Sequence, residues 1–322
     1  MKQVGNDIKV SICCVAYNHE RFIKKCLDGF VMQQTNFLFE ILVHDDASTD
    51  NTASIVREYE ENYPKLFRCV YQIENQFYKQ NTLVNILFRM AGGKYIALCE
   101  GDDYWTDPHK LQKQVDFLEL NDNFSACAHY YDILRGNVLI KNKASSQIDE
   151  VSLVDILNMR AGLHTATLLF RSDILKNRKF PKNIMSGDLY FYLCCSIYGK
   201  IKFLPYNMSV YRKHIGGLSN TVAVSKMRND FNMLPYLLEI DPRFPKNSFR
   251  LYVIASIINY STQIKRYQLF KYALLFQYYL YTSKIEYDIS DLLVKTKKFV
   301  HGTLPRFQRR LLRLIGFYND FK

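Results

Sequence analysis

Two acidic clusters in the first third of the chain combine residue types that could do chemistry. Asp45 and Asp46 follow one apolar run, and residues 100–103 (EGDD) follow another. Carboxylate oxygens are the ligands that Mg²⁺ and Mn²⁺ prefer, and such a cation can bridge diphosphate oxygens and neutralise a leaving group. The sequence contains neither GxGxxG nor GxxxxGKS/T, so no glycine-rich loop of these kinds offers backbone amides to phosphate. Asp102 and Asp103 are therefore candidate metal ligands.

An isolated Asp pair has a second interpretation, as a helix cap or a solvated turn. The apolar run before Asp102 and the Trp105 that follows it favour a site at the end of a buried strand.

Apolar runs and helical patterns alternate along the first hundred residues. Continuous apolar runs, which are typical of strands buried on both faces, span residues 8–16, 39–44, 67–72 and 94–99. Apolar residues at helical spacing predict helices over residues 22–31, 52–62 and 82–90. This alternation predicts an α/β fold with a mostly parallel sheet, whose ligands gather beyond the carboxyl ends of the strands. Both acidic clusters lie at such ends.

The pattern changes beyond the acidic clusters. A helix is predicted over 108–121, with Pro108 in its first turn. A second helix is predicted over 188–198, and strand-like runs span residues 125–133, 165–170, 201–204 and 208–211. From about residue 227 the pattern is helical and rich in aromatic residues. We therefore expect a catalytic domain over 1–220 and a helical extension over 221–322.

The composition excludes several classes of protein. Apolar residues make up 48% of the chain and aromatic residues 15%, which is enough to bury a core and argues against disorder. The longest uncharged stretches are 14 residues (251–264) and 12 residues (272–283), whereas a membrane-crossing helix needs about 20. Residues 1–7 lack the features of a signal peptide, so we expect a cytoplasmic protein. The eight cysteines contain no CxxC pair and are interpreted as buried thiols.

Five motifs together resemble family 2 glycosyltransferases of the GT-A fold, most closely the bacterial surface-polysaccharide enzymes. They are VSICCVAYN (10–18), EILVHDDASTD (40–50), GKYIALCEGDDYWTDPHKL (93–111), Gly187 with Asp188, and YRKHIGGLS (211–219). The resemblance covers about residues 8–220. It implies a Rossmann-like fold and an inverting transferase that takes a nucleotide-diphosphate sugar, expected to be a UDP-sugar, with Mn²⁺ or Mg²⁺ as cofactor.

The resemblance also assigns roles on the donor side. Tyr17 and Asp46 would frame the nucleotide base, by stacking and by accepting a base N–H. Glu100 would lie near the ribose, where the family commonly has the first Asp of its DxD motif. Asp102 would bind the metal, and Asp103 would support the metal site.

Three further residues receive roles from the resemblance. Asp188 would deprotonate the acceptor hydroxyl, His214 would approach the metal or the diphosphate, and Asn85 would lie near the diphosphate. Without the resemblance, the sequence favours a helix cap at Asp188 and is equally consistent with a half-buried histidine at His214, whereas His44 and His164 are interpreted as structural. The sequence departs from the family pattern where Glu100 replaces Asp, Ala47 replaces the Gly of the DDGS loop, and Gly187 replaces an acidic residue.

Other functions compete with glycosyl transfer to a glycan or lipid-linked acceptor. A nucleotidyltransferase also uses paired Asp–metal chemistry but is expected to have a Gly-rich basic loop, which residues 17–21 do not provide. A nucleic-acid-binding protein would explain the basic C-terminal part, but its acidic clusters would repel the ligand, so no nucleic acid is expected. A catalytically silent relative would more often have lost Asp102 or Asp188.

The net charge of +12 is concentrated at the C-terminus. Residues 221–322 contain 17 Lys/Arg against 7 Asp/Glu, a net charge of +10. Within them, residues 304–318 place apolar side chains on one helical face, with Arg306, Arg309, Arg310 and Arg313 largely off it. This basic amphipathic helix suits either an anionic membrane surface, which would place the enzyme on the inner face of the cell membrane, or packing against the catalytic domain.

Overall fold

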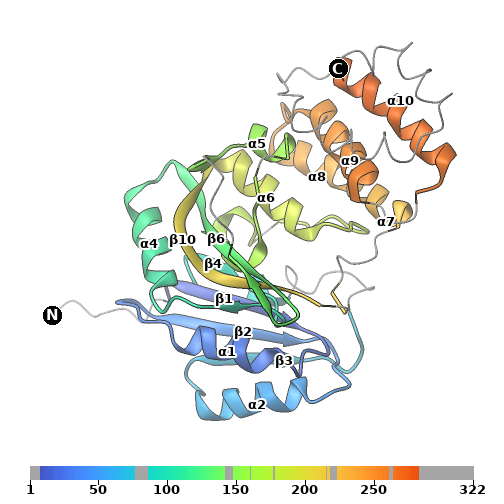
Figure 1. Ribbon diagram of the computed structural model, residues 1–322. Helices are drawn as coiled ribbons and strands as arrows, with labels where there is room; N and C mark the ends of the chain where they lie inside the picture. Colours follow the sequence, from blue (N-terminus) through green and yellow to red (C-terminus); the bar gives the residue numbers. More distant parts are fainter. Residues whose placement is uncertain are drawn as a thin grey trace. The chain divides into compact units, whose positions relative to one another are not determined.

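The structure of this chain is a computed structural model that describes residues 8–76, 86–141, 148–159, 161–176, 178–214, 216–217, 223–260 and 264–282 (Figure 1). The chain divides into two compact units. Unit 1 comprises Met1–Ser152, Gly162–Lys182 and Phe191–Ile215. Unit 2 comprises Leu153–Ala161, Asn183–Tyr190 and Gly216–Lys322.

Unit 1 is built on one sheet of ten described strands. The strands are β1 (Val10–Ala16), β2 (Phe39–Asp45), β3 (Phe67–Tyr71), β4 (Tyr95–Leu98), β5 (Tyr104–Trp105), β6 (Phe124–Arg135), β7 (Val138–Ile140), β8 (Glu150–Val151), β9 (Leu169–Arg171) and β10 (Lys200–Lys213). Their order is β3-β2-β1-β4-β9-β6-β10-β5, with β7 paired to β6 and β8 paired to β10.

The first four strands form the predicted parallel sheet. β3, β2, β1 and β4 are mutually parallel, whereas β9 runs antiparallel to both of its neighbours, β4 and β6. β6 and β10 are again parallel, and both run in the same direction as β4. The strand order reverses between β1 and β4, and such a switch point opens a crevice at the carboxyl ends of the strands. We call this edge of the sheet the switch-point edge.

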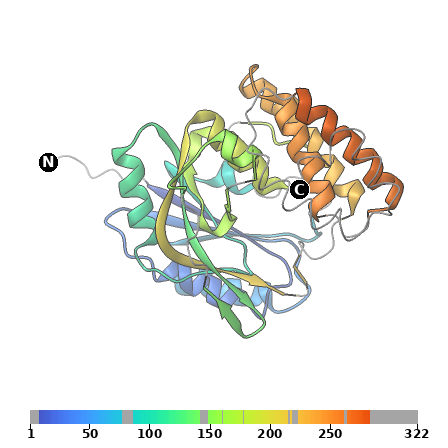
Figure 2. The ribbon, with the colours of Figure 1, turned by 45° about the horizontal axis from the view of Figure 1, so that its top comes forward.

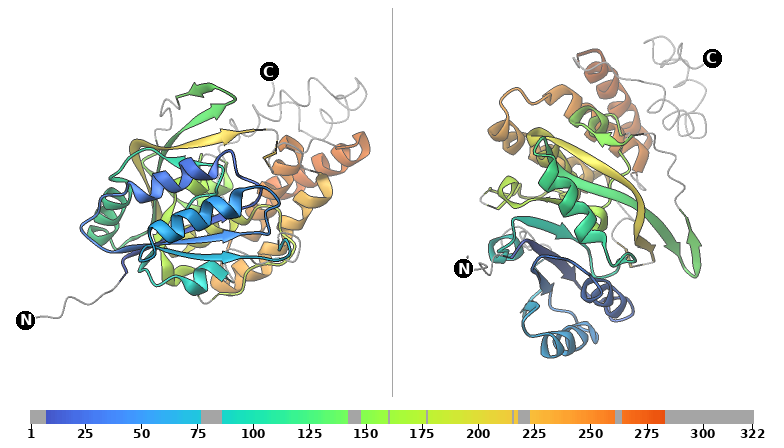
Figure 3. Two further views of the ribbon diagram at one scale, coloured as in Figure 1. Left: turned by 90° about the horizontal axis from the view of Figure 1, so that it is seen from below. Right: turned by 90° about the vertical axis from the view of Figure 1, so that its left-hand side faces the viewer.

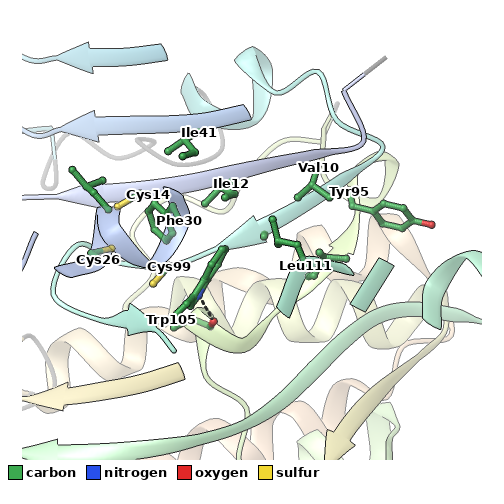
Figure 4. Packing of buried hydrophobic residues seen from close by; sticks show 14 of the residues in the cluster. Val10, Ile12, Cys14, Cys26, Phe30, Ile41, Tyr95, Cys99, Trp105 and Leu111 are labelled. Atoms are coloured by element: carbon green, nitrogen blue, oxygen red, sulfur yellow. Dashed lines mark hydrogen bonds between the residues drawn. The ribbon is translucent and has the colours of Figure 1, made fainter. Parts of the chain in front are cut away.

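The core of unit 1 explains why β1 is apolar along its whole length. Val10, Ile12 and Cys14 are fully buried in one cluster with residues of helix α1 (Ile23–Val31). Among these, the ring of Phe30 lies 4.8 Å from that of Trp105 in β5 (Figure 4). The Trp105 indole N–H donates to the Ala166 carbonyl at 2.9 Å, so the cluster ties α1 to the chain segment around β9.

The remaining helices confirm the predictions at 52–62 and 108–121, whereas the helix predicted over 82–90 is seen only at Phe88–Met90 and its residues 82–85 lie outside the described residues. Unit 1 also contains α2 (Thr52–Asn62), α3 (Phe88–Met90) and α4 (Lys110–Leu120). Of these, α2 lies beside α1 (Figure 2). Helix α6 (Gly187–Tyr198) begins in unit 2 and continues in unit 1. Short 3₁₀ turns lie at Thr165–Thr167 and Ser172–Ile174.

Unit 2 is helical where the structure describes it. Its helices are α5 (Leu153–Leu157), α7 (Val224–Arg228), α8 (Met233–Ile240), α9 (Lys246–Tyr260) and α10 (Arg266–Thr282), with a 3₁₀ turn at Asn229–Asn232. α9 packs against α5, α7 and α10 and buries Phe249 and Ile254. None of the described helices is long and apolar enough to cross a membrane. The amphipathic helix predicted over 304–318 lies outside the described residues.

Two strand predictions were wrong in detail. Residues 165–167 form a 3₁₀ turn instead of a strand because side chains compete for the backbone: the His164 ring accepts the Ala166 N–H, and the Thr167 hydroxyl donates to the His164 carbonyl. The strands predicted at 201–204 and 208–211 are one strand, β10, whose register with β6 is irregular around Asn207. Pro205, which has no N–H to donate, lies beside this irregularity.

Gly93 fixes how β4 enters the sheet. Its N–H donates to the Ser11 hydroxyl at 2.9 Å, and a Cβ at this position would lie 2.6 Å from the Ser11 nitrogen and 2.8 Å from the Val10 carbonyl carbon. Backbone atoms cannot move aside as a flexible side chain can. Gly93→Ala should therefore destabilise the protein by about 1–3 kcal/mol, measured as a lower midpoint in urea or thermal unfolding. Gly162→Ala is the matched control because nothing lies within 4 Å of its added Cβ; equal midpoints for the two variants would contradict this packing.

Ala47 has a left-handed backbone conformation, with φ +60°, in the loop where the family pattern has Gly. The turn is held by Ser48, whose N–H donates to the Asp45 carboxylate at 3.1 Å and whose hydroxyl accepts the Asn18 N–H at 2.9 Å. The left-handed region costs an L-residue about 1–2 kcal/mol, whereas glycine loses about 0.5–1 kcal/mol more backbone freedom on folding. Ala47→Gly should therefore raise the free energy of unfolding by up to about 1 kcal/mol. Ala53→Gly in α2 should lower it by about 1 kcal/mol, and a loss of stability in both variants would refute the strain at Ala47.

Candidate active site

The loops that follow β1, β2 and β4 meet at the switch-point edge of unit 1. The Asp46 N–H donates to the Ala16 carbonyl, and the Gly101 N–H donates to the Val15 carbonyl, each at 2.9 Å. These two bonds bring both acidic clusters beside the end of β1. The acidic clusters therefore lie together because parallel neighbours end at the same edge.

The β1 and β2 loops present one aromatic ring and one buried carboxylate. Tyr17 is 43% exposed, so its ring is available for stacking. Asp46 is buried, and its carboxylate accepts the Gln76 N–H at 2.6 Å. The Asp50 carboxylate accepts the backbone N–H groups of Thr52 and Glu20, which fixes the loop after β1 to the start of α2.

The carboxylates of Glu100 and Asp103 accept hydrogen bonds from residues near β9 and in β10. The Thr165 hydroxyl donates to the Glu100 carboxylate at 2.5 Å, and the Arg212 backbone N–H donates to Asp103 Oδ1 at 2.8 Å. Burial raises the pKa of Asp103, and the neighbouring charges of Asp102 and Glu100 raise it further. The Asp103 carboxylate is thus a buried anchor, whereas that of Asp102 remains accessible.

His164 lies against the same buried carboxylate. Its Nε2 is 3.6 Å from Asp103 Oδ2, and burial lowers the pKa of His164 to about 4, so the ring is neutral at pH 7. Because Nδ1 accepts the Ala166 N–H, the ring proton lies on Nε2, on the side of Asp103. Of the two histidines interpreted as structural, His44 is fully buried inside β2, whereas His164 is a neighbour of the acidic cluster.

Asp102 is the carboxylate on which the partners from β10 converge. His214 Nε2 lies 2.9 Å from Asp102 Oδ2, and the Arg212 guanidinium donates to the Asp102 carbonyl at 2.5 Å. The Phe22 ring packs on His214 at 4.6 Å between centroids. The side chains of Asp102 and His214 are both partly open to solvent. A partly accessible acid–imidazole pair is therefore held between the loop after β4 and the end of β10.

This pair fits a hard divalent cation. His214 Nε2 and Asp102 Oδ2 are hydrogen-bonded to each other at 2.9 Å, and a cation held by both would replace that hydrogen bond, since two neighbouring ligands of an octahedral Mg²⁺ lie about 3 Å apart. No cluster of three or more metal-ligating side chains is present in the part of the chain that the structure describes. Mg²⁺ commonly takes one or two carboxylates and completes its shell with substrate phosphates and water, so two protein ligands are sufficient.

The sequence interpretation missed His19, Arg212 and Thr165. His19 Nε2 lies 4.0 Å from Asp102 Oδ2, and a Cβ on Gly101 would approach His19 Nδ1 to 2.8 Å. Burial lowers the pKa of His19, against the opposing charge of Asp102. His19 and Arg212 lie within or directly after motifs that carry the family resemblance, which is the signal that could have found them. Nothing in the sequence indicates the contact of Thr165 with Glu100.

Asp188 belongs to unit 2, where it lies in the first turn of α6. Asp188 is exposed at the surface of the structure. Desolvation by the surrounding protein nevertheless raises the pKa of its carboxyl group. A raised pKa makes the carboxylate a stronger base.

Asp230, which the sequence interpretation also missed, anchors the segment before Asp188. Its carboxylate accepts the backbone N–H groups of Met185 and Ser186 at 2.7 and 2.9 Å and the Ser186 hydroxyl at 2.7 Å. Burial raises the pKa of Asp230, and the charge of Asp188 contributes to the shift. Asp230 therefore fixes the chain immediately before Asp188 within unit 2.

The structure gathers six of the residues that the family resemblance assigns. Tyr17, Asp46, Glu100, Asp102, Asp103 and His214 all lie at the switch-point edge of unit 1. Asp188 lies in unit 2, and Asn85 lies outside the described residues.

Comparison with known proteins finds sequence relatives of this chain. A 214-residue alignment, 36% identical, joins 65% of this chain to 60% of an uncharacterised protein of Mycobacterium tuberculosis. The chain thus spans less than two thirds of that relative. A 189-residue alignment, 28% identical, covers 58% of the chain and 70% of WfgD of Escherichia coli, a UDP-Glc:alpha-D-GlcNAc-diphosphoundecaprenol beta-1,3-glucosyltransferase.

Solved structures share the fold. TarS 1–349 of S. aureus in complex with UDP-GlcNAc superposes with a TM-score of 0.59 and 18% identity over 93% of both chains. A mannosyltransferase of Pyrobaculum calidifontis in complex with GDP-Man and Mn²⁺ superposes with a TM-score of 0.55 and 16% identity, over 96% of this chain and 84% of that one. The model of the family described as "Glycosyl transferase family 2" matches residues 11–187. Since that match spans more than half of a chain whose acidic residues gather at the switch point of this fold, the protein belongs to glycosyl transferase family 2.

Proposed function

We propose that this protein is an inverting glycosyltransferase that moves a hexosyl or N-acetylhexosaminyl group from a nucleotide-diphosphate sugar, most simply a UDP-sugar, to a glycan or lipid-linked acceptor. The observation that carries the proposal is the accessible Asp102–His214 pair, held at the switch-point edge to which the exposed Tyr17 also belongs. Family membership and the nucleotide-sugar complexes of related folds support it. A nucleotidyltransferase is disfavoured by the family assignment.

The donor would bind along the switch-point edge. Tyr17 is suited to stacking on the base, and the Asp46 carboxylate to accepting a base N–H. Glu100, held by Thr165, has the reach to accept from ribose hydroxyls. Asn85, which would lie near the diphosphate, is outside the described residues, so its role rests on the resemblance alone.

Asp102 and His214 would hold Mn²⁺ or Mg²⁺, with Asp103 supporting the site through Arg212. When bound, the cation would neutralise the donor diphosphate and so favour its departure. The residues of this chain contribute orientation: Arg212 fixes the Asp102 main chain, and Phe22 fixes the His214 ring. A preorganised site does not have to rearrange while charge develops.

Asp188 would take the proton of the acceptor hydroxyl. Inversion requires the acceptor oxygen to attack the anomeric carbon from the face opposite the leaving diphosphate, and a carboxylate within reach of that oxygen accepts its proton as the new bond forms. The raised pKa of Asp188 suits this role, and Asp230 would keep its segment in place.

The identity of the acceptor and its location at the membrane are proposed by analogy with relatives. WfgD and WfaP of Escherichia coli are named as glucosyltransferases for GlcNAc-diphosphoundecaprenol. We propose that this chain likewise extends a lipid-linked glycan for a surface polysaccharide such as capsule or lipopolysaccharide, from the inner face of the cell membrane. The catalytic function would reside in residues 1–220, and the basic residues 221–322 would contribute to membrane contact.

Metal dependence through Asp102 is directly testable. Asp102→Ala should abolish Mn²⁺-dependent binding of the donor as well as turnover, because the diphosphate loses its main neutralising partner. The measurement is calorimetric titration of the donor with Mn²⁺ and with EDTA. The control variant is Asp122→Ala, because the Asp122 side chain is almost fully exposed. It should bind the donor with the affinity of the unchanged protein. Full transfer in EDTA would rule out the metal-dependent mechanism.

Asp188→Asn separates chemistry from donor binding. Asparagine keeps the shape but cannot accept the proton, so transfer should fall by about 10²–10⁴-fold while donor affinity persists. Initial rates and donor titrations on the same preparation measure the two effects. Glu239→Gln, an exposed change on α8 of unit 2, should alter neither. If donor affinity falls together with the rate, Asp188 is a binding or structural residue.

A further inference from the structure

Two imidazole rings from different segments lie beside the Asp102 carboxylate. His214 Nε2 lies 2.9 Å from Asp102 Oδ2, and His19 Nε2 lies 4.0 Å from the same oxygen. The Phe22 ring contacts both imidazoles, with its centroid 6.4 Å from that of His19 and 4.6 Å from that of His214. Only the His214 ring is within hydrogen-bonding distance of the carboxylate. His19 is thus a close neighbour of Asp102 that makes no hydrogen bond to it.

The backbone of His19 is fixed by contacts with two helices. Its N–H donates to the Thr52 hydroxyl at 2.7 Å, and its carbonyl accepts the N–H groups of Phe22 and Ile23, each at 2.8 Å. Ile23 begins α1 and Thr52 begins α2, and these two helices lie side by side (Figure 3). His19 is therefore held where the two helices start.

Gly101 leaves the space that the His19 ring occupies. A Cβ at position 101 would lie 2.8 Å from His19 Nδ1, 2.9 Å from Ile23 Cδ1 and 3.1 Å from the Ala16 Cβ. Any side chain on the residue before Asp102 would therefore push against the ring. The ring and the loop that carries Asp102 are close-packed, so a change in one is transmitted to the other.

The surroundings of the His19 ring favour a proton on Nε2. Nδ1 is buried and has no hydrogen-bond partner within the described part of the chain, so it is unpaired in either tautomer. A proton on Nδ1 would be a buried donor without an acceptor, whereas a proton on Nε2 lies beside the negative charge of Asp102. Nε2 of His19 is therefore a hydrogen-bond donor next to the Asp102 carboxylate.

A cation bound by Asp102 and His214 would replace the hydrogen bond between them, so the carboxylate would lose its present donor. Side chains that bind metals are commonly oriented by hydrogen bonds from groups that do not touch the metal themselves. His19 Nε2, now 4.0 Å from Asp102 Oδ2, needs to approach by only about 1 Å to make such a bond at the usual length of about 3 Å.

We propose that His19 is a positioning residue of the cation site: its Nε2–H donates to the Asp102 carboxylate once His214 no longer does, and so keeps that carboxylate directed at the ion. The role rests on the proposed function, because it takes Asp102 and His214 as the side chains that hold the cation. His19 itself touches neither the cation nor the donor.

The affinity for Mn²⁺ in the absence of donor tests this role without measuring turnover. His19→Ala removes the N–H, and His19→Gln returns an N–H near the position of Nε2. Titration of the full chain with Mn²⁺, with the free ion followed by electron paramagnetic resonance, should show binding about 10–100-fold weaker for His19→Ala, the usual effect of losing such a partner. His19→Gln should recover most of this loss. His109→Ala, at an exposed position, is the matched control and should bind as the unchanged chain does.

Gly101→Ala tests the same contact from the other side and does not alter His19 itself. The added methyl group should displace the ring and weaken Mn²⁺ binding, whereas Gly101→Ala/His19→Ala should bind no more weakly than His19→Ala, because the N–H is already absent. Losses that add in the double variant would contradict the proposal. The thermal midpoint of each variant shows that folded protein is being titrated.

Three outcomes separate this role from the proposed function. Full Mn²⁺ affinity in His19→Ala, with binding lost in Asp102→Ala, overturns the role of His19 and leaves the metal site standing. Equal losses in His19→Ala and His19→Gln mean that the ring only fills space, and they also overturn it. No Mn²⁺ binding by the unchanged chain contradicts the metal site of the proposed function and the role of His19 together.

Discussion

The contact between Asp102 and the end of β10 is the interaction on which the site depends. Asp102 lies in the turn after β4, and Arg212 and His214 are more than a hundred residues away in sequence. Three contacts join the two segments: His214 to the Asp102 carboxylate, the Arg212 guanidinium to the Asp102 carbonyl, and the Arg212 N–H to buried Asp103. They connect the parallel half of the sheet, where a nucleotide would bind, to the half formed by β6 and β10. They add to the pairing of β5 with β10, in which Tyr104 lies opposite Val210 and Trp105 opposite Ser209, in holding the acidic loop beside β10.

The constraint has an energetic cost that other groups offset. Asp103 is buried next to two more carboxylates, which raises its pKa and disfavours its charged form. The backbone N–H of Arg212 and the nearby guanidinium act in the opposite direction. Burial lowers the pKa of His164 and of His19, so these two rings contribute little positive charge beside the acids. The Arg212 guanidinium contacts the Asp102 carbonyl and not its carboxylate, which leaves that carboxylate able to attract a cation.

The spacing of apolar residues predicted the helices and strands well where that spacing matches the faces that are buried in the fold. Helix α2 begins and ends at the predicted residues, and β1, β2 and β4 follow their apolar runs because both faces of these strands are buried. It failed at residues 165–167, where side chains capture backbone groups. It also gave no sign that Lys110 would be buried over the Trp105 ring, where burial lowers its pKa to about 7. The motifs identified the carboxylates, but the partners that hold them, Thr165, Arg212 and Asp230, depend on tertiary contacts between distant segments.

The central claim is that the Asp102–His214 pair is the donor site of a glycosyltransferase. The most direct measurement incubates the chain with a panel of nucleotide sugars and Mn²⁺ and scores the released nucleoside diphosphate, in parallel with a His214→Ala variant. We expect release from one class of donor, strongly reduced in the variant. Release from no donor, or undiminished release by His214→Ala, would contradict the claim.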